Sequence, residues 1–228
     1  MQATRFDAGS DPARNKVSAQ DVCKRLSEIN CAGEAFCCDV PGRSVEACRA
    51  DILKTCAQDL MLDQIAQNPI TGFDPAAAER AFAELESKAS KCDSSVAAWG
   101  SSPQGLRALL HGTVAPDGNC MPAQALPDPP SIAAALLSCS DNRACLYDSP
   151  LSPWSCAPRG AAGAACVTDN NCQDGLYCLL PPLAVNGSCT PRKASGESCV
   201  EPRECKSLFC KQSKCVDADQ QAAYCLVN

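Results

Sequence analysis

The sequence predicts a small disulfide-rich fold, in which a disulfide-linked helical bundle is followed by tandem four-cysteine knots with turns and short β-hairpins. Three observations support this prediction. Cysteine occupies 20 of the 228 positions, helical periodicity fills the first half of the chain, and one cysteine spacing repeats through the second half. The expected boundaries are a polar arm over residues 1–17, a helical domain over 18–115 and three cysteine-rich repeats over 116–228.

The apolar content is too small for a conventional core in a chain of this length. Beside the 20 cysteines there are 36 alanines, which leaves 48 bulky apolar side chains. Burying one such side chain contributes about 1.5–3 kcal/mol, whereas ordering each residue costs about 1–2 kcal/mol. Covalent cross-links are the expected supplement. The same shortage argues against a large α/β enzyme domain, which needs long strands rich in Val, Ile and Leu.

Four helices are expected in the first half. Ser18 is the expected cap of the first helix, and Ser44 caps a second helix that carries cysteines on one face. Asp74 followed by proline is a strong start signal for a third helix. A short fourth helix begins at Ser102-Pro103 and ends near Gly112. Cysteines on the buried faces indicate a bundle whose helices are cross-linked.

A repeated cysteine unit organises the second half. The spacing C-x5-C-x10-C at residues 139–156 recurs 33 residues later at 172–189, and both copies continue as C-x-P-R-x3-G-x2-C. This internal repeat indicates one disulfide unit used in tandem. The first unit contains an insertion with a short helix expected over residues 131–137. The units are Cys120, Cys139, Cys145 and Cys156, then Cys166, Cys172, Cys178 and Cys189, then Cys199, Cys205, Cys210 and Cys215.

All 20 cysteines are expected to form structural disulfides. The chain lacks the C-x-x-C pair of zinc ribbons and thioredoxin-like sites. Pairing first-to-third and second-to-fourth is one option within a unit, although sequence does not determine connectivity. If every cysteine pairs internally, the odd number before Cys120 requires a bond between the halves, with Cys225 or Cys120 and Cys92 as expected partners. The remaining cysteines are Cys23, Cys31, Cys37, Cys38, Cys48 and Cys56.

Charge and motifs argue against several functions. A net charge of −6 and a pI near 4.8 disfavour a nucleic-acid partner, which needs a basic face. No run approaches the ~18 apolar residues of a membrane helix. The one histidine, His111, stands at a predicted helix end, where it interacts with the last carbonyls. Asp169-Asn170-Asn171 lacks the alternation of a calcium loop and is interpreted as a turn. We therefore expect no enzyme, no metal and no cofactor.

Two features could serve binding. The segment between Pro191 and Cys215 contains six basic and three acidic residues, and this local positive charge could bind an anionic partner. The alternative interpretation of this patch is a solvated charged rim. Separately, Arg159 or Arg192 on a loop pinned by disulfides would suit a protease inhibitor, because rigidity lowers the entropic cost of binding. The patch residues are Arg192, Lys193, Arg203, Lys206, Lys211 and Lys214.

The repeats resemble a known class of sequences. The run Gly163-x2-Cys166-x5-Cys172-x2-Gly175-Leu-Tyr-Cys178, which begins again at Gly196, is similar to the amino-terminal cysteine-rich domain of the Dickkopf family. It looks closer to alanine-rich exported proteins and lipoproteins of myxobacteria, which place a Cys-Cys pair and an Asp-x-Ala-Ala-Ala helix start before such repeats. Phe36-Cys37-Cys38 and the segment 73–78 fit that outline. The resemblance implies an exported surface protein and transfers no catalytic residue.

These observations predict a non-catalytic, exported structural or interaction protein. Disulfides persist in oxidising compartments, so we expect it to be secreted or on the cell surface, with the periplasm a weaker alternative. Residues 1–20 lack the apolar stretch of a signal peptide, so a signal removed upstream is expected, with a lipid anchor as one mode of attachment. The expected partners are a protein, the envelope surface or further copies of the chain.

Overall fold

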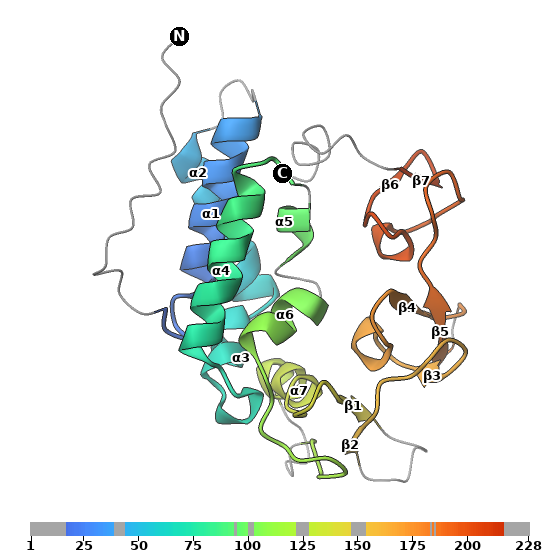
Figure 1. Cartoon of the computed structure of the whole chain (residues 1–228). Helices are drawn as coiled ribbons and strands as arrows, with labels where there is room; N and C mark the ends of the chain where they lie inside the picture. Colours follow the sequence, from blue (N-terminus) through green and yellow to red (C-terminus); the bar gives the residue numbers. More distant parts are fainter. Residues whose placement is uncertain are drawn as a thin grey trace.

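The two halves of the chain are built from different elements, as the sequence predicts. The computed structural model describes residues 17–38, 44–93, 95–99, 103–121, 128–146, 154–182, 184 and 186–216. Figure 1 shows the helices of the first half on one side and the small strands of the second half running back beside them. No helix within these ranges combines the length and apolar character needed to cross a membrane.

Three long helices form the frame of the first half. Helix α1 (Val22–Cys37) packs against α2 (Val45–Lys54) and α4 (Pro75–Ala89). Caps at Ser44 and Asp74 are confirmed, because the Ala47 amide donates to Ser44 Oγ at 3.1 Å and the Ala76 amide donates to Asp74 Oδ1 at 2.8 Å.

The predicted cap at Ser18 is wrong. The Asp21 amide donates to the Ser18 carbonyl at 3.0 Å, which makes a turn before the helix, and Asp21 itself occupies the cap position of α1.

Shorter elements close the helical core. A π-helical turn, η1 (Thr55–Asp59), extends α2 and is followed by α3 (Leu62–Gln67), the 3-10 turn η2 (Pro69–Thr71), α5 (Ser95–Trp99) and α6 (Pro103–Leu109). The predicted fourth helix is thus α6, whereas α3 and α5 are short helices that the sequence pattern does not predict. The core includes the buried side chains of Val22, Leu26, Phe82, Leu85 and Leu109.

Helix α1 is the covalent anchor of this half. Its three bonded cysteines reach three different segments, as Cys23–Cys56, Cys31–Cys48 and Cys37–Cys92. Loss of a native disulfide from a small domain typically costs about 2–5 kcal/mol. These bonds therefore supplement an apolar core that is modest for the length of the chain.

The insertion in the first unit forms helix α7 (Pro129–Leu136), close to the predicted range. Its cap is Asp128, whose Oδ1 accepts from the Ser131 amide at 2.8 Å. Ala133 and the following Leu137 pack against the helical core, while Leu136 packs against the cysteines of the first unit. The insertion therefore joins the two halves by apolar contact.

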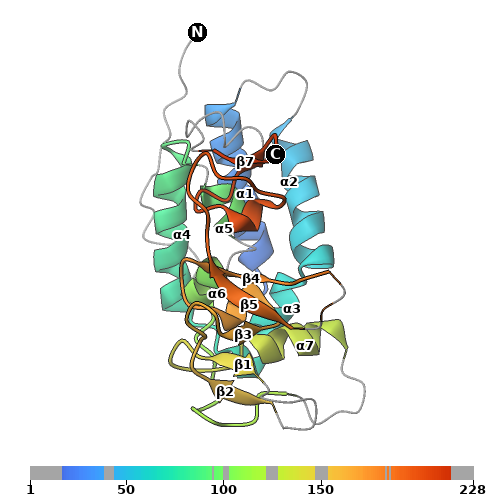
Figure 2. The same cartoon turned by 90° about the vertical axis from the view of Figure 1, so that its right-hand side faces the viewer.

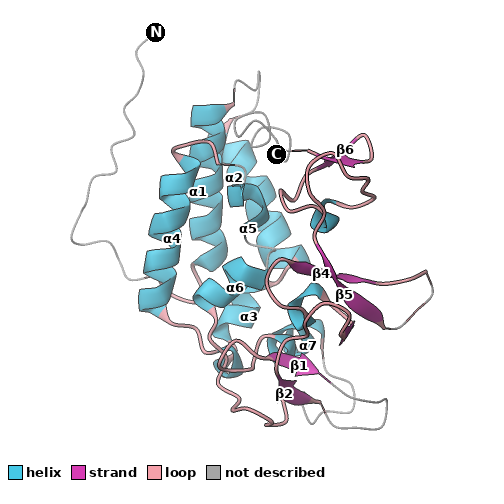
Figure 3. Ribbon diagram, turned by 45° about the vertical axis from the view of Figure 1, so that its right-hand side comes forward, coloured by secondary structure: helices cyan, strands magenta, loops and turns pink. Residues whose placement is uncertain are grey.

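Each four-cysteine unit contains a short antiparallel sheet. Strands β1 (Ala144–Leu146) and β2 (Ser155–Ala157) pair in the first unit. In the second, β5 (Gly187–Pro191) lies between β3 (Ala165–Cys166) and β4 (Leu176–Leu179). Strands β6 (Cys210–Lys211) and β7 (Lys214–Cys215) form the hairpin of the third. Figures 2 and 3 show the three sheets following one another along the helical half.

One disulfide pattern recurs in all three units. The first cysteine bonds the third and the second bonds the fourth, and the third and fourth cysteines lie opposite each other on paired strands. The six bonds are Cys120–Cys145, Cys139–Cys156, Cys166–Cys178, Cys172–Cys189, Cys199–Cys210 and Cys205–Cys215.

The expected partners of a bond between the halves need correction. Cys120 bonds within its own unit, and Cys92 bonds Cys37, so neither joins the halves. Local geometry decides both pairings, because each cysteine finds its partner on an element packed beside it. Cys38 is disulfide-bonded as well, but its bond falls outside the described part of the chain, as does Cys225.

Candidate functional site

The six basic residues predicted as a binding patch divide into two groups. Lys193 Nζ lies 2.5 Å from Glu204 Oε2, and Asp169 forms ion pairs with Arg192 at 3.7 Å and Arg203 at 3.4 Å. Since Asp169 belongs to the second unit and Arg203 to the third, these pairs hold neighbouring units together. The first group is therefore structural in this conformation.

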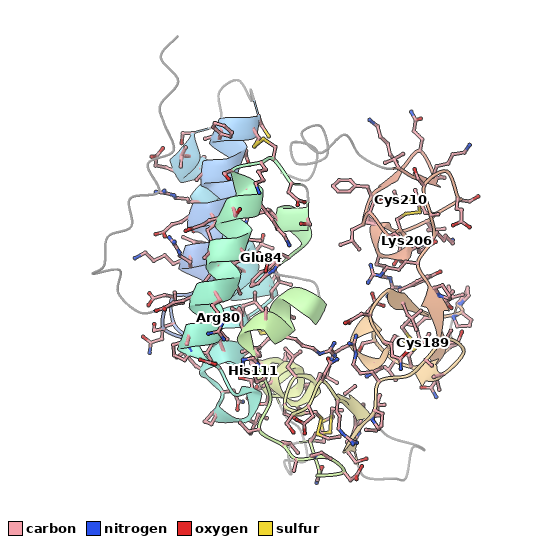
Figure 4. All side chains as sticks on the ribbon, in the orientation of Figure 1. Arg80, Glu84, His111, Cys189, Lys206 and Cys210 are labelled. Atoms are coloured by element: carbon pink, nitrogen blue, oxygen red, sulfur yellow. A yellow bond between two sulfur atoms is a disulfide. The ribbon has the colours of Figure 1, made fainter. Side chains whose placement is uncertain are left out.

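The second group comprises Lys206, Lys211 and Lys214, which are exposed in the third unit. Lys211 and Lys214 face each other across β6 and β7, and no carboxylate in the described residues pairs with any of the three. The connecting residues Gln212 and Ser213 both have left-handed backbone, with φ of 49° and 61°. Figure 4 places Lys206 beside Cys210, at the far end of the second half from α7.

The expectation that Arg159 or Arg192 is displayed as inhibitor bait is wrong. A bait side chain must be exposed to enter a protease pocket, but the Arg159 and Arg192 side chains are only 5% and 9% exposed. Arg159 Nη1 donates to Asp174 Oδ1 at 2.7 Å. Ion pairs with Asp174 and Asp169 hold the two covered guanidinium groups within the protein.

Cysteine clusters inside the units resemble metal sites only in their spacing. In each unit three sulfur atoms lie within 4.8 Å of one another. Every one of these sulfurs is held in a disulfide. Metal binding requires a free thiolate, and a sulfur held in a disulfide does not supply one. Each cluster is therefore part of two adjacent disulfides that form the centre of its unit.

A cavity of about 490 Å³ lies where the helical half meets the first two units. Its walls are the end of α6 with His111 and Gly112, the end of α7, the segment 139–143 and Asn170. His111, which Figure 4 shows close to α6 and α7, has Nε2 at 3.8 Å from Asp74 Oδ2. The cavity is thus built from segments that are distant in sequence.

Asn170 is the centre of the polar contacts at this junction. Its Nδ2 donates to the Leu136 carbonyl at 2.8 Å, while its own carbonyl accepts from Arg107 Nη2 at 3.0 Å and from Arg159 Nε at 3.3 Å. The side-chain oxygen of Asn170 also accepts from Arg107. One residue of the second unit therefore contacts α6, α7 and the link that precedes its own unit.

Arg107 carries a buried donor without a described partner. Its Nη2 is bonded to Asn170, but Nη1 is buried and makes no hydrogen bond within the described residues. Burial, reinforced by repulsion from Arg159, lowers the pKa of Arg107 to about 10. Leaving a buried donor unpaired typically costs about 1–3 kcal/mol, and more for a charged group. The cation at the cavity wall therefore lacks full compensation.

The backbone around the cavity adopts unusual conformations. Asp141 and Asn142 have φ of 54° and 57°, and the Arg143 amide donates to the Ser140 carbonyl at 3.1 Å across them. Both central residues of this tight turn are thus left-handed, a conformation that Asp and Asn tolerate better than most residues. Asn142 Oδ1 also accepts from Arg159 at 3.4 Å.

The sequence predicts the turn at residues 169–171, which is the 3-10 turn η3 (Asp169–Asn171), but it carries no signal for the cavity. Arg107 has no motif around it, and its relation to Asn170 depends on how the halves pack. No family model matches the chain, and neither a curated protein nor a solved structure shows significant similarity to it.

Proposed function

We propose that the chain is a non-catalytic, exported structural or interaction protein that is secreted or displayed on the cell surface. The observation that carries this proposal is the placement of the disulfides. Each small unit is centred on two of them, with few bulky apolar side chains around them. Such units depend on an oxidising compartment, because reduction would remove most of what holds them.

The location can be tested on intact source cells. An antibody against the oxidised protein is expected to label the cells, or the culture medium, without permeabilisation. Alkylation before lysis should leave the cysteines unmodified, because they are in disulfides. Recovery only from the cytosol, with alkylated thiols, would contradict the proposal.

We further propose that the β6–β7 hairpin contacts an acidic surface of a partner, of the cell envelope or of another copy of the chain. Like charges placed opposite each other on paired strands repel, and Lys211 and Lys214 are in that register. The left-handed Gln212 and Ser213 add backbone strain of about 1–2 kcal/mol each. An anionic partner would relieve the repulsion, which supports a binding role for this tip.

Charge reversal with a matched control tests the hairpin. Replacing Lys206, Lys211 and Lys214 by Glu is expected to abolish salt-sensitive retention on an anionic polysaccharide resin and to weaken any self-association seen by light scattering. The same change at Lys24, Lys54 and Lys91, which are exposed on the helical half, alters the net charge equally and should leave retention largely intact. Equal loss in both variants would point to net charge alone.

We also infer that the chain belongs with the alanine-rich exported proteins of myxobacteria that its repeats resemble. The support is the cysteine spacing together with the recurrence of one bond pattern in three units. Antibody labelling of such cells, or genes encoding the same unit beside export signals, would test this assignment.

A further inference from the structure

The junction cavity has the position and size of a small-molecule site. Ligand pockets typically measure about 300–1,000 Å³ and occur at domain interfaces, with apolar walls and a few converging polar groups. This cavity, of about 490 Å³, lies between the helical half and the first two units. Leu110, Leu136 and Leu137 supply its apolar wall, while Arg107, Ser140 and Asn170 supply polar groups.

The charge at the cavity points to the class of ligand. Asp174 attracts the Arg107 cation, but its carboxylate is bonded to Arg159, and no described carboxylate forms an ion pair with Arg107. The second arginine of the wall, Arg143, forms an ion pair with Asp117, with Nη1 at 3.5 Å from Oδ1. Exposed Asp141 adds a negative charge at the rim. One incompletely compensated cation beside the single acidic residue Asp141 favours a monoanion and disfavours a dianion.

We propose that this cavity binds a small organic monocarboxylate through Arg107. A planar guanidinium matches a carboxylate in shape and hydrogen bonding. Nη1 is covered in this conformation, so a change of the Arg107 side-chain torsions on ligand entry presents it to the carboxylate. The leucine wall receives the body of the ligand, and Ser140 and Asn170 contact its polar substituents.

Titration calorimetry on the oxidised full chain tests the proposal. The probes are glucuronate and benzoate, two monocarboxylates with a polar and an apolar body, with glucose and benzyl alcohol as neutral counterparts. Inorganic phosphate is the dianion control, and the titrations are made at about pH 8, where its second proton is largely lost. Each monocarboxylate is expected to bind at least about tenfold more tightly than its neutral counterpart and than phosphate. The monocarboxylate that binds more tightly shows whether the cavity prefers a polar or an apolar ligand body.

Three variants separate binding from folding. Arg107→Gln is expected to weaken carboxylate binding by about tenfold or more. Arg25→Gln removes a half-buried arginine that pairs with Glu28 and Glu86 on the far helices, and should leave binding unchanged. Ser140→Trp keeps Arg107 and its contact with Asn170 but fills the cavity, so it should also abolish binding. Disulfide maps identical to that of the parent protein show that the variants are folded.

Several outcomes would overturn the proposal. These are equal affinity for the neutral counterparts, tighter binding of phosphate, no binding of any probe up to about 10 mM, or unchanged carboxylate affinity in a correctly folded Ser140→Trp variant. None of them bears on export or on the hairpin, so the proposed function stands or falls separately.

Discussion

At the scale of single residues, Gly112 shows how closely the two halves approach. Its φ is 67°, and a Cβ atom at this position would lie 2.3 Å from the Cys139 carbonyl group and 2.5 Å from the Ser138 oxygen. The Gly112 amide donates to the Thr71 carbonyl at 2.8 Å. The atoms that such a Cβ would overlap belong to the backbone, which cannot move aside as a flexible side chain could. Glycine is therefore required at this position.

Replacing Gly112 by alanine should therefore destabilise the fold by more than about 3 kcal/mol, through steric overlap and left-handed strain together. Denaturant unfolding provides the measurement. Gly163 is a matched control, because its φ is 87° but nothing lies within 4 Å of a Cβ there. Gly163→Ala should cost only about 1–2 kcal/mol of left-handed strain, and equal losses would argue against the overlap.

Asp63 and Asp74 should affect stability with opposite dependence on pH. Burial raises the pKa of Asp63, so its stabilising contribution is complete below the unfolded pKa and is lost as pH rises through the folded pKa. Backbone amides of Ala77 and Ala76 lower the pKa of Asp74, so its contribution is present above the unfolded pKa and is lost as pH falls through the folded pKa.

As pH rises from about 3 to about 7, the free energy of unfolding of Asp63→Asn should increase relative to that of the parent protein. Over the same range that of Asp74→Asn should decrease relative to the parent. The amide at position 63 can still accept the hydrogen bond from the Cys23 amide, now 2.9 Å long. Urea unfolding across this pH range gives both slopes. Slopes of the same sign would contradict the assigned environments.

At the scale of elements, one polar side chain organises the turn before the second cysteine of a unit. In the second unit Asn171 Oδ1 accepts from the Val167 and Thr168 amides, each at 2.9 Å. In the third, Glu204 Oε1 accepts from the amides of residues 200 and 201, each at 3.2 Å, within η4 (Pro202–Glu204). The amide oxygen of Asn171 and the carboxylate oxygen of Glu204 thus accept equivalent hydrogen bonds at equivalent positions of the two units.

Replacing Glu204 by alanine should cost about 1–3 kcal/mol, because amides of the turn lose their acceptor. Hydrogen exchange at Val200 and Glu201 should accelerate, while the Val167 and Thr168 amides of the second unit remain protected. Asn171→Ala should give the reverse pattern. Faster exchange in both units from either variant would show that the turns are not independent.

At the scale of the whole molecule, the halves are joined by packing and polar contacts in the described residues. Helix α7, Asn170 and the close approach at Gly112 connect them. Of the nine described disulfides, three lie within the helical half and six within the repeats, so none of the nine links the halves. Cys38 is also in a disulfide. Of the 20 cysteines, Cys225 alone remains outside both the nine pairs and Cys38.

We therefore predict a bond between Cys38 and Cys225, which would tie the end of α1 to the last residues of the sequence. Peptide mapping under non-reducing conditions should recover these two cysteines in one linked pair. Cys225→Ser should leave a single alkylatable thiol at Cys38 in the monomer. Linkage of Cys38 to any other cysteine would contradict this assignment.

The sequence alone was sufficient for features that depend on local chemistry or on repetition. Caps at Ser44 and Asp74, the helical first half and the three equivalent cysteine units follow from residue preferences and spacing that act within a few positions. Only tertiary structure decided how the arginines are used. Arg159 is buried, Arg192 is mostly covered and Arg107 lines a cavity. The surroundings of each arginine depend on segments that packing brings together, and the spacing of residues along the chain does not encode which segments meet.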